Sequence, residues 1–185
     1  MKQIGMQEFA GKRVWVIGAS SGIGEACAIA LFAAGASVAL SGRRLQNLQT
    51  VAQHAKPNQS LILPLDVTEP KAIQESYQKL IQEWGQLDLL LFVSGIYIPL
   101  RADNFEMESA EKTINANVLG PMRAVAVVLP NMLKQHSGHI AIVGSVAGYS
   151  GLPKALAYGP SKAAMINFTK PGEIMCTPMP LGCKS

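Results

Sequence analysis

Apolar side chains follow two alternating patterns along this chain of 185 residues. Short runs of apolar, often β-branched residues are typical of strands, whereas apolar residues that recur every three or four positions predict amphipathic helices. The runs predict strands over residues 13–17, 37–41, 61–65, 87–94 and 139–145. The recurring pattern predicts helices over residues 25–34, 45–54, 69–84, 109–135 and 155–170, with Thr68 as the N-cap of the third and kinks at Pro121 and Pro130 in the fourth.

The regular alternation of strands and helices predicts the fold class. Each predicted strand is followed by a helix after a short connection, and such an order requires a parallel sheet with right-handed crossovers. The sequence therefore predicts an α/β fold with a doubly wound parallel sheet and helices on both faces. We expect one domain over residues 1–170, followed by a short atypical tail over residues 171–185.

Composition narrows the classes of protein that fit this pattern. Apolar residues make up 49% of the chain and charged residues 15%, which supplies a core and argues against disorder. The net charge is +4, but the basic residues are scattered, so we expect no nucleic-acid partner. The spacing of the three cysteines matches no zinc or disulfide framework, so we expect reduced thiols and no metal.

Two features that the sequence lacks, a secretory signal and a membrane-spanning segment, predict where the protein resides in the cell. Residues 1–10 lack the apolar segment of a secretory signal. The charge-free apolar stretch over residues 89–100 is too short to span a bilayer, and Pro99 interrupts it. We therefore expect a cytoplasmic protein without a membrane anchor.

A glycine-rich turn follows the first predicted strand, with the sequence Gly18-Ala-Ser-Ser-Gly22-Ile-Gly24. Glycines there permit a tight turn, close approach of a diphosphate to the backbone, and close packing of helix on strand. The following helix start offers free N–H groups and the positive end of its dipole to phosphate. Glycines also serve ordinary turns, but the position directly after the first strand favours a dinucleotide site in a Rossmann-type fold.

The end of the second predicted strand indicates which dinucleotide is bound. NAD sites usually place a carboxylate there, which accepts a hydrogen bond from the ribose 2′-hydroxyl. Here Gly42 occupies that place and is followed by Arg43 and Arg44, whose guanidinium groups suit a 2′-phosphate. The alternative is that both arginines only begin a surface helix. We favour NADP(H) over NAD(H).

Three residues form a candidate catalytic group. Tyr158 and Lys162 are four residues apart, so that they share one face of the last predicted helix. A cation close to a tyrosine hydroxyl favours the phenolate and suits it to acid–base catalysis at neutral pH. Ser145 ends the fifth predicted strand, where its hydroxyl could polarise a carbonyl oxygen. Taken singly, the three would more often be a packing residue, a solvated lysine and a helix cap.

Together these motifs resemble the classical short-chain dehydrogenases/reductases. The glycine-rich turn matches the cofactor loop of that family, and Ser145, Tyr158 and Lys162 match its catalytic serine, tyrosine and lysine. Asn117 matches a fourth catalytic position, an asparagine that helps hold a proton-relay water. The resemblance covers roughly residues 9–170 and rests on several motifs at once.

The resemblance implies a dinucleotide-binding and catalytic domain in which the cofactor carries the hydride chemistry. Ser145 would hold the carbonyl oxygen, Tyr158 would exchange the proton, Lys162 would tune Tyr158 and bind ribose, and Asn117 would support proton resupply. The cofactor-binding residues that it implies are Gly18, Ser20, Ser21, Gly22, Ile23, Gly24, Arg43, Arg44, Asp66, Val67, Ser94, Gly95, Tyr158, Lys162, Pro171 and Gly172.

The sequence departs from the family pattern at two strand ends. Ile17 stands where the family usually has threonine before the glycine loop. Phe92-Val93-Ser94-Gly95 stands where the family usually has Asn-Asn-Ala-Gly, so that the amides which tie this strand to its neighbours are missing. Gly95 still permits close approach of a cofactor.

The largest departure lies at the C-terminus. The family continues with a sixth strand that ends in Pro-Gly, a substrate loop and a seventh strand, whereas here Lys170 leads directly into Pro171-Gly172. We expect the C-terminal strands to be missing or incomplete and the fifth strand to have an uncovered edge, which invites pairing with another chain. A truncated or internally deleted gene product, an alternative isoform and a reduced but working variant all fit.

Two functions remain open. The first is an oxidoreductase that transfers hydride between NADP(H) and a carbonyl or alcohol, and the full set of Ser145, Tyr158, Lys162 and Asn117 favours it. The second is a dinucleotide-binding protein without turnover, an impaired enzyme or a redox sensor, which the short C-terminus favours. Apolar loops over residues 96–103 and 149–156 suggest a lipophilic small-molecule substrate. The resemblance also implies a homo-oligomer, a dimer or a tetramer.

Overall fold

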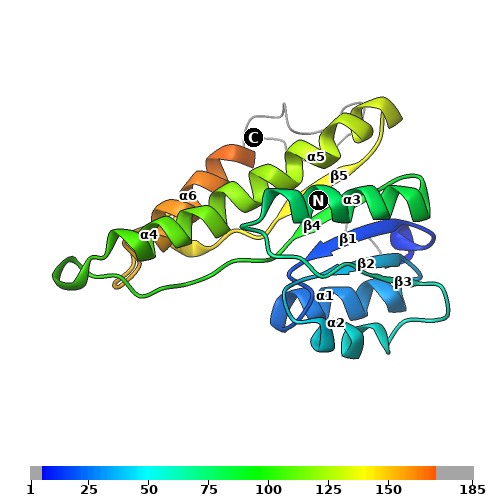
Figure 1. The fold of residues 1–185 in the computed structure, drawn as a ribbon, viewed down its shortest axis with the longest axis horizontal. Coiled ribbons are helices and arrows are strands. Elements are labelled where there is room, and N and C mark those ends of the chain that lie inside the picture. The colour runs from blue at the N-terminus through cyan, green and yellow to red at the C-terminus, as the bar shows by residue number, and fades with distance from the viewer. Residues whose placement is uncertain (1–5, 170–185) are drawn as a thin grey trace.

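The computed structural model describes residues 6–169 and confirms the predicted α/β Rossmann-type fold (Figure 1). Five strands form one sheet in the order β3-β2-β1-β4-β5, and every neighbouring pair is parallel. The strands are β1 (Arg13–Ile17), β2 (Ser37–Ser41), β3 (Ser60–Ile62), β4 (Leu89–Phe92) and β5 (His139–Ile142). The order changes direction at β1, so that the ends of β1 and β4 border the crevice where doubly wound sheets bind ligands.

Helices cover both faces of the sheet. The helices on one face are α1 (Gly22–Ala33) and α2 (Leu45–Ala52), and those on the other are α3 (Pro70–Trp84) and α5 (Gly120–Gln135) (Figure 1). Because successive strand side chains point to opposite faces, β1 supplies both cores. Val14 and Val16 pack with the α1 and α2 side, while Trp15 and Ile17 pack with the α3 and α5 side.

The helix predicted over residues 109–135 is present but contains an irregular turn. It consists of α4 (Met107–Ile114), the π-helical turn η3 (Asn115–Leu119) and α5. Pro121 lies in the first turn of α5, where its missing N–H is tolerated. This 29-residue helix is long and apolar enough to cross a membrane by length and composition alone, but half of the tested window is buried inside the fold.

Several element boundaries differ from the sequence-based expectation. The strands β4 and β5, for example, end at Phe92 and Ile142 rather than at residues 94 and 145. Pro64 cannot donate to a ladder, and β3 ends at Ile62. The helix α3 begins at Pro70 with Glu69 as its N-cap, because the Thr68 hydroxyl instead donates to Asp66 Oδ1. The last helix, α6 (Tyr158–Thr169), begins three residues later than predicted, because Ala155 still forms a β-bridge with Leu100.

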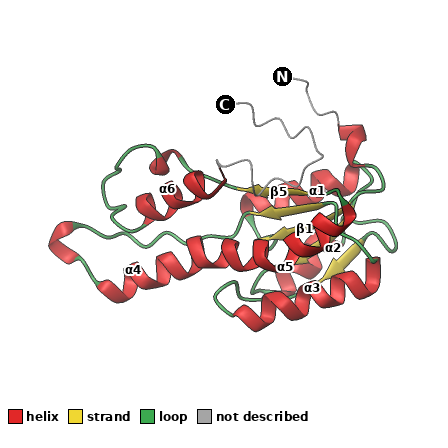
Figure 2. Cartoon of the chain, turned by 90° about the horizontal axis from the view of Figure 1, so that it is seen from above, coloured by secondary structure: helices red, strands yellow, loops and turns green. Residues whose placement is uncertain are grey.

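Helices α4 and α6 extend past one end of the sheet (Figure 2). A small apolar cluster of Leu100, Ala110 and Ala157 joins them there. Within residues 6–169, β5 pairs with β4 alone. The predicted tail over residues 171–185 lies outside the described residues.

Candidate active site

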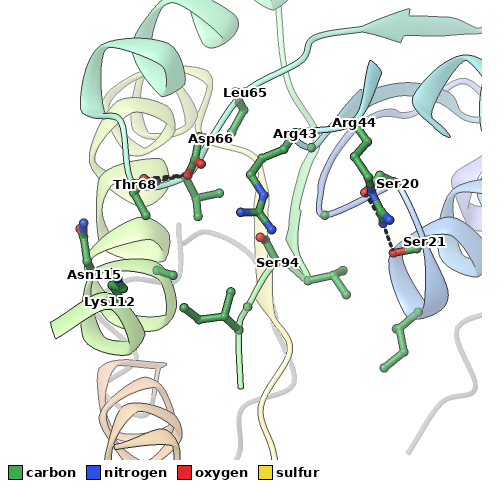
Figure 3. A pocket seen from close by; sticks show the side chains of 18 residues that line it. Ser20, Ser21, Arg43, Arg44, Leu65, Asp66, Thr68, Ser94, Lys112 and Asn115 are labelled. Atoms are coloured by element: carbon green, nitrogen blue, oxygen red, sulfur yellow. Dashed lines mark hydrogen bonds between the residues drawn. The ribbon is translucent and has the colours of Figure 1, made fainter. Parts of the chain in front are cut away.

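A cavity of about 560 Å³ opens where the chain leaves the carboxyl ends of the central strands (Figure 3). We call it the strand-end cavity. Most of the cofactor-binding residues predicted from the sequence line it. Its lining consists of Gly18, Ser20, Ser21, Ile23, Gly42, Arg43, Arg44, Leu65, Asp66, Val67, Thr68, Val93, Ser94, Gly95, Ile96, Lys112, Asn115 and Ala116.

The glycine-rich turn brings backbone segments closer together than any side chain would allow. A Cβ atom added to Gly18, which has a φ of +102°, would lie 2.5 Å from Ser94 N. One added to Gly24 would lie 2.0 Å from Gly18 O. Gly22 begins α1, and nothing lies within 4 Å of its added Cβ, so that this helix start is open. The turn therefore presents bare backbone and a helix N-terminus, which suits a diphosphate.

The two predicted arginines have different surroundings. The Arg44 guanidinium donates to Ser21 Oγ at 2.9 Å and to Ser20 Oγ at 3.5 Å. The exposed Arg43 side chain points into the strand-end cavity (Figure 3), and within residues 6–169 it forms no side-chain hydrogen bond or ion pair. Its charge is therefore available to an anionic ligand.

Charge in the strand-end cavity is predominantly positive. Three cationic side chains, Arg43, Arg44 and Lys112, and one anionic side chain, Asp66, line it. Because Lys112 is paired with Glu108, the positive charge comes from the two arginines, which outweigh the one carboxylate. The Asp66 carboxylate accepts hydrogen bonds from Thr68 N at 2.9 Å and from Thr68 Oγ1 at 2.8 Å. This turn fixes the rim of the cavity at Asp66, which the family resemblance assigns to cofactor binding.

Asn117 is buried at the π-helical turn, with only 1% of its surface exposed. Its side chain holds the loop after β4 from both directions, because Ile96 N donates to Oδ1 at 2.8 Å and Nδ2 donates to Ile96 O at 2.9 Å. Nδ2 also donates to Ser161 Oγ at 3.1 Å. The Ser161 hydroxyl donates in turn to Tyr158 O at 2.7 Å, which ties η3 to the start of α6.

Tyr158 and Lys162 share one face of α6, as predicted. Lys162 Nζ lies 5.8 Å from the centroid of the Tyr158 ring and donates to Val143 O at 3.0 Å. Lys162 is almost fully buried, and this burial lowers the pKa of its ammonium. A Cβ added to Gly95, which lines the strand-end cavity, would lie 3.7 Å from Lys162 Nζ. Lys162 therefore adjoins the cavity at Gly95.

Ser145 is half-buried and lies three residues beyond the end of β5, not at the strand end as predicted, and it caps a short 3₁₀ turn, η4 (Val146–Gly148). Its hydroxyl oxygen accepts from Ala147 N at 3.2 Å, so that the cap considered from sequence is present. A hydroxyl that accepts one hydrogen bond still has a proton to donate. The cap thus holds Ser145 in place without using its donor.

Sequence reasoning missed several residues that the structure brings to this site. Tyr97 contacts the Tyr158 ring edge-to-face at 5.2 Å between centroids, and its hydroxyl donates to Lys154 O at 3.3 Å. Asn115 and Lys112 line the cavity from the α4–η3 side. Their helical position two and five residues before Asn117 was an available signal. Tyr97 was indicated only as part of the apolar loop over residues 96–103, which the sequence assigned to the substrate. Pro171 and Gly172, also predicted to bind cofactor, lie outside the described residues.

Burial of Lys162 leads to a prediction about stability. The folded chain lowers the pKa of this lysine below its usual value of ~10.4. At pH values below the lowered pKa the lysine is charged in the folded chain, and the free-energy cost of burying that charge opposes folding. Lys162→Met should therefore raise the free energy of unfolding of the nucleotide-free chain at neutral pH. This gain should shrink as pH rises from the lowered pKa toward the usual one.

Urea denaturation of both chains at neutral and at alkaline pH measures the effect. The exposed Lys79→Met is the matched control and should change stability little. A Lys162→Met chain that is less stable than wild type at neutral pH would contradict the account of its burial.

Comparison with known proteins identifies the family. The short chain dehydrogenase family model matches residues 12–173. An uncharacterized oxidoreductase from Staphylococcus aureus (strain MW2) is 32% identical over 155 residues, which are 84% of this chain and 67% of that protein. Another from Staphylococcus saprophyticus is 33% identical over 168 residues, 89% of this chain and 72% of that protein.

Solved structures agree with this match. A short-chain type dehydrogenase/reductase from Mycobacterium marinum has a TM-score of 0.82 and 28% identity, over 89% of this chain and 69% of that chain. A short-chain dehydrogenase from Streptomyces avermitilis has a TM-score of 0.82 and 27% identity, over 87% of this chain and 59% of that one. The chain belongs to the short-chain dehydrogenase family of oxidoreductases, and it spans about two thirds of the length of most of these relatives.

Proposed function

We propose that this chain is an NADP(H)-dependent oxidoreductase that transfers hydride between the cofactor and a carbonyl or alcohol. Membership of the family implies a nicotinamide dinucleotide cofactor and a small-molecule substrate. The observation that carries the finer proposal is the pairing of two features across Gly95. A cationic cavity with the exposed Arg43 lies on one side, and Tyr158, Lys162 and Asn117 lie on the other.

The residues that line the strand-end cavity fit this cofactor. The bare backbone at Gly18 and the open helix start at Gly22 leave room for a diphosphate. Arg43 and Arg44 would hold a 2′-phosphate, since no carboxylate follows β2 to repel it. The turn formed by Asp66 and its neighbours would flank the adenine.

The predicted catalytic residues would then act in distinct ways. When bound, the nicotinamide would supply or accept the hydride. Ser145 would donate a hydrogen bond to the substrate oxygen, and Tyr158 would transfer the proton to or from that oxygen. Lys162 would hold a positive charge beside the Tyr158 ring and bind the ribose hydroxyls. Asn117 would keep the loop at Ile96 in place and support proton resupply.

Exposed apolar side chains around Ser145 and Tyr158 favour a lipophilic substrate. Val146 is 76% exposed and Tyr149 is 77% exposed, and further apolar residues of this group are Tyr97, Leu152 and Leu156. A ketone or aldehyde with a hydrocarbon body would cover this surface and leave its oxygen at Ser145. A cytoplasmic location and a homo-oligomeric state, dimer or tetramer, complete the proposal.

One observation favours a second function, a dinucleotide-binding protein without turnover. The lining of the strand-end cavity reaches Gly95 and Ile96 but does not include Ser145, Tyr158 or Lys162. A ligand could therefore fill the cavity without contact with the catalytic group. Binding of NADPH without reduction of any carbonyl would select this alternative.

The cofactor preference can be tested at Arg43. Arg43→Ala should weaken NADPH binding about tenfold, because it removes a charge-assisted hydrogen bond to the 2′-phosphate. NADH binding should stay within about twofold of wild type, since NADH has no such phosphate. Isothermal titration calorimetry measures both. Arg101→Ala, at an exposed arginine paired with Asp103, is the matched control. Equal losses for the two nucleotides would contradict the role given to Arg43.

The proposed activity is tested with NADPH and a panel of lipophilic ketones and aldehydes. Loss of absorbance at the reduced nicotinamide band should match the alcohol formed, one for one. Alcohol formation at equal rates with and without the protein would overturn the proposed enzyme function.

A further inference from the structure

Arg123 on α5 connects two parts of the site by hydrogen bonds. Its Nη1 donates to Asn115 Oδ1 at 2.7 Å, and Asn115 is the first residue of the π-helical turn and lines the strand-end cavity. The same nitrogen lies 3.4 Å from Val67 O and 3.5 Å from Thr68 O, at the rim of that cavity. One half-buried guanidinium thus contacts both the rim and the turn that carries Asn117.

The π-helical turn makes this connection possible. In a regular α-helix, residues eight positions apart differ by about 80° in direction, so that Asn115 and Arg123 would not share a face. The Gly120 N–H bonds to Asn115 O, five residues back, and so adds one residue to the turn. The extra residue brings the two side chains to within about 20° of one another.

The rim of the strand-end cavity, at Val67 and Thr68, packs closely against helix α5. A Cβ added to Gly120 would lie 3.2 Å from Val67 Cβ, so that the start of α5 and the rim residue Val67 are already in contact distance. Val67 is only 8% exposed. A shift of the rim therefore cannot be absorbed by empty space and must be passed to α5 and η3.

The other end of this connection is the loop after β4. Asn117 follows Asn115 by two residues in the same turn, and its amide holds Ile96 N and Ile96 O. A chain of direct contacts therefore leads from the rim at Val67, through Arg123 and Asn115, to the backbone at Ile96. Gly95, beside Ile96, is the place where the cavity adjoins Lys162.

We propose that Arg123 is a positioning residue that couples occupation of the nucleotide cavity to the position of Asn117 and Ile96. This inference rests on the proposed function only in taking the cavity as an NADP(H) site. A nucleotide that presses on the rim at Val67 and Thr68 would tighten the Arg123 hydrogen bonds. The π-helical turn and the Ile96 loop would then be held more firmly where the catalytic residues need them.

Amide hydrogen exchange on the full chain tests this inference. Saturating NADPH should slow exchange of the Ile96 amide about tenfold in wild type. In Arg123→Met the slowing should fall below about twofold, although NADPH is still bound. Arg123→Lys keeps the charge but offers one compact ammonium in place of the planar fork, so it should restore only part of the protection. The exposed Lys134→Met, on the same helix, should behave as wild type.

The outcomes separate this inference from the proposed function. Equal NADPH-dependent protection of Ile96 in wild type and in both Arg123 variants would overturn the inference and leave the proposed function standing. Failure of wild type to bind NADPH would overturn both. If Arg123→Met does not fold, the comparison of Arg123→Lys with wild type decides, and full protection in that variant counts against the inference. Loss of protection in Lys134→Met as well would also overturn it.

Discussion

Tyr158→Phe is expected to lower carbonyl turnover about a thousandfold, because phenylalanine has no proton to exchange with the substrate oxygen. The edge-to-face contact with Tyr97 and the contact with Lys162 Nζ involve the ring, which phenylalanine retains. NADPH affinity should therefore stay within about twofold of wild type. Steady-state rates with a reactive aldehyde, together with an NADPH titration, measure the two quantities on the same preparation.

A second tyrosine provides the control for this substitution. Tyr77 is buried on α3, where it stacks on Trp15 at 5.9 Å between centroids, and it does not line the strand-end cavity. Tyr77→Phe should leave turnover unchanged within about twofold. Turnover in Tyr158→Phe equal to that of wild type would remove Tyr158 from the proposed chemistry. A parallel loss of NADPH binding would mean that the substitution acts on cofactor affinity instead.

Gly24→Ala should have the largest effect on stability. In an ordinary helical position alanine is favoured over glycine by about 1 kcal/mol, so that a stabilised chain would be the default expectation. Here the added Cβ would lie 2.0 Å from Gly18 O, a backbone atom that is fixed by the turn and cannot rotate away. We expect the chain to lose about 3 kcal/mol of stability. A higher helix propensity would stabilise the chain, whereas a clash with Gly18 O would destabilise it. The sign of the change in stability therefore shows whether Gly24 lies as close to Gly18 O as described.

Thermal unfolding measures this effect, and the midpoint should fall by about 10 °C. NADPH binding should weaken as well, because the turn that would hold the diphosphate is displaced. Gly151→Ala is the control, since nothing lies within 4 Å of its added Cβ and its φ is ordinary. An unfolding midpoint for Gly24→Ala at or above that of wild type would show that helix and turn are not packed as described.

The sequence predicted the sheet because its strands depend on local pattern. All five predicted strands exist, and their apolar runs are long enough to be covered on both faces, as Val14 and Trp15 illustrate from opposite sides of β1. The boundaries were less predictable because tertiary contacts decide them. The Leu100 to Ala155 bridge delays the start of α6, and the hydrogen bond between Thr68 and Asp66 moves the start of α3.

At two strand ends, Ile17 and Phe92 stand where the family usually has polar residues. The structure shows, as the sequence could not, how these strand ends stay connected. Ile17 and Phe92 are both buried in the apolar core, so that they take part in packing where the family usually has polar side chains. The connection between β1 and β4 is maintained by backbone instead, because Val93 N and Ser94 N both donate to Ile17 O. The loss of side-chain amides therefore leaves the two strand ends tied together.

The parts of the site that sequence could not predict depend on long-range geometry. The sequence predicted one helix over residues 109–135 with kinks or breaks at Pro121 and Pro130, and gave no sign of the π-helical turn, although that turn carries Asn117 and brings Asn115 beside Arg123. The motif predicted Arg43 and Arg44 as equivalent, whereas Arg44 is held by the Ser21 hydroxyl and Arg43 is left to the cavity. Neither the π-helical turn nor the different surroundings of the two arginines can be predicted from the spacing or the composition of the sequence.

Calorimetric titration of the 185-residue chain with NADPH, and separately with NADH, tests the central claim most directly. The charge and the bare backbone of the strand-end cavity predict one NADPH per chain, bound about tenfold more tightly than NADH. Absence of binding by either nucleotide would contradict the assignment of the cavity as the cofactor site. Tighter binding of NADH would contradict the role of Arg43 and Arg44.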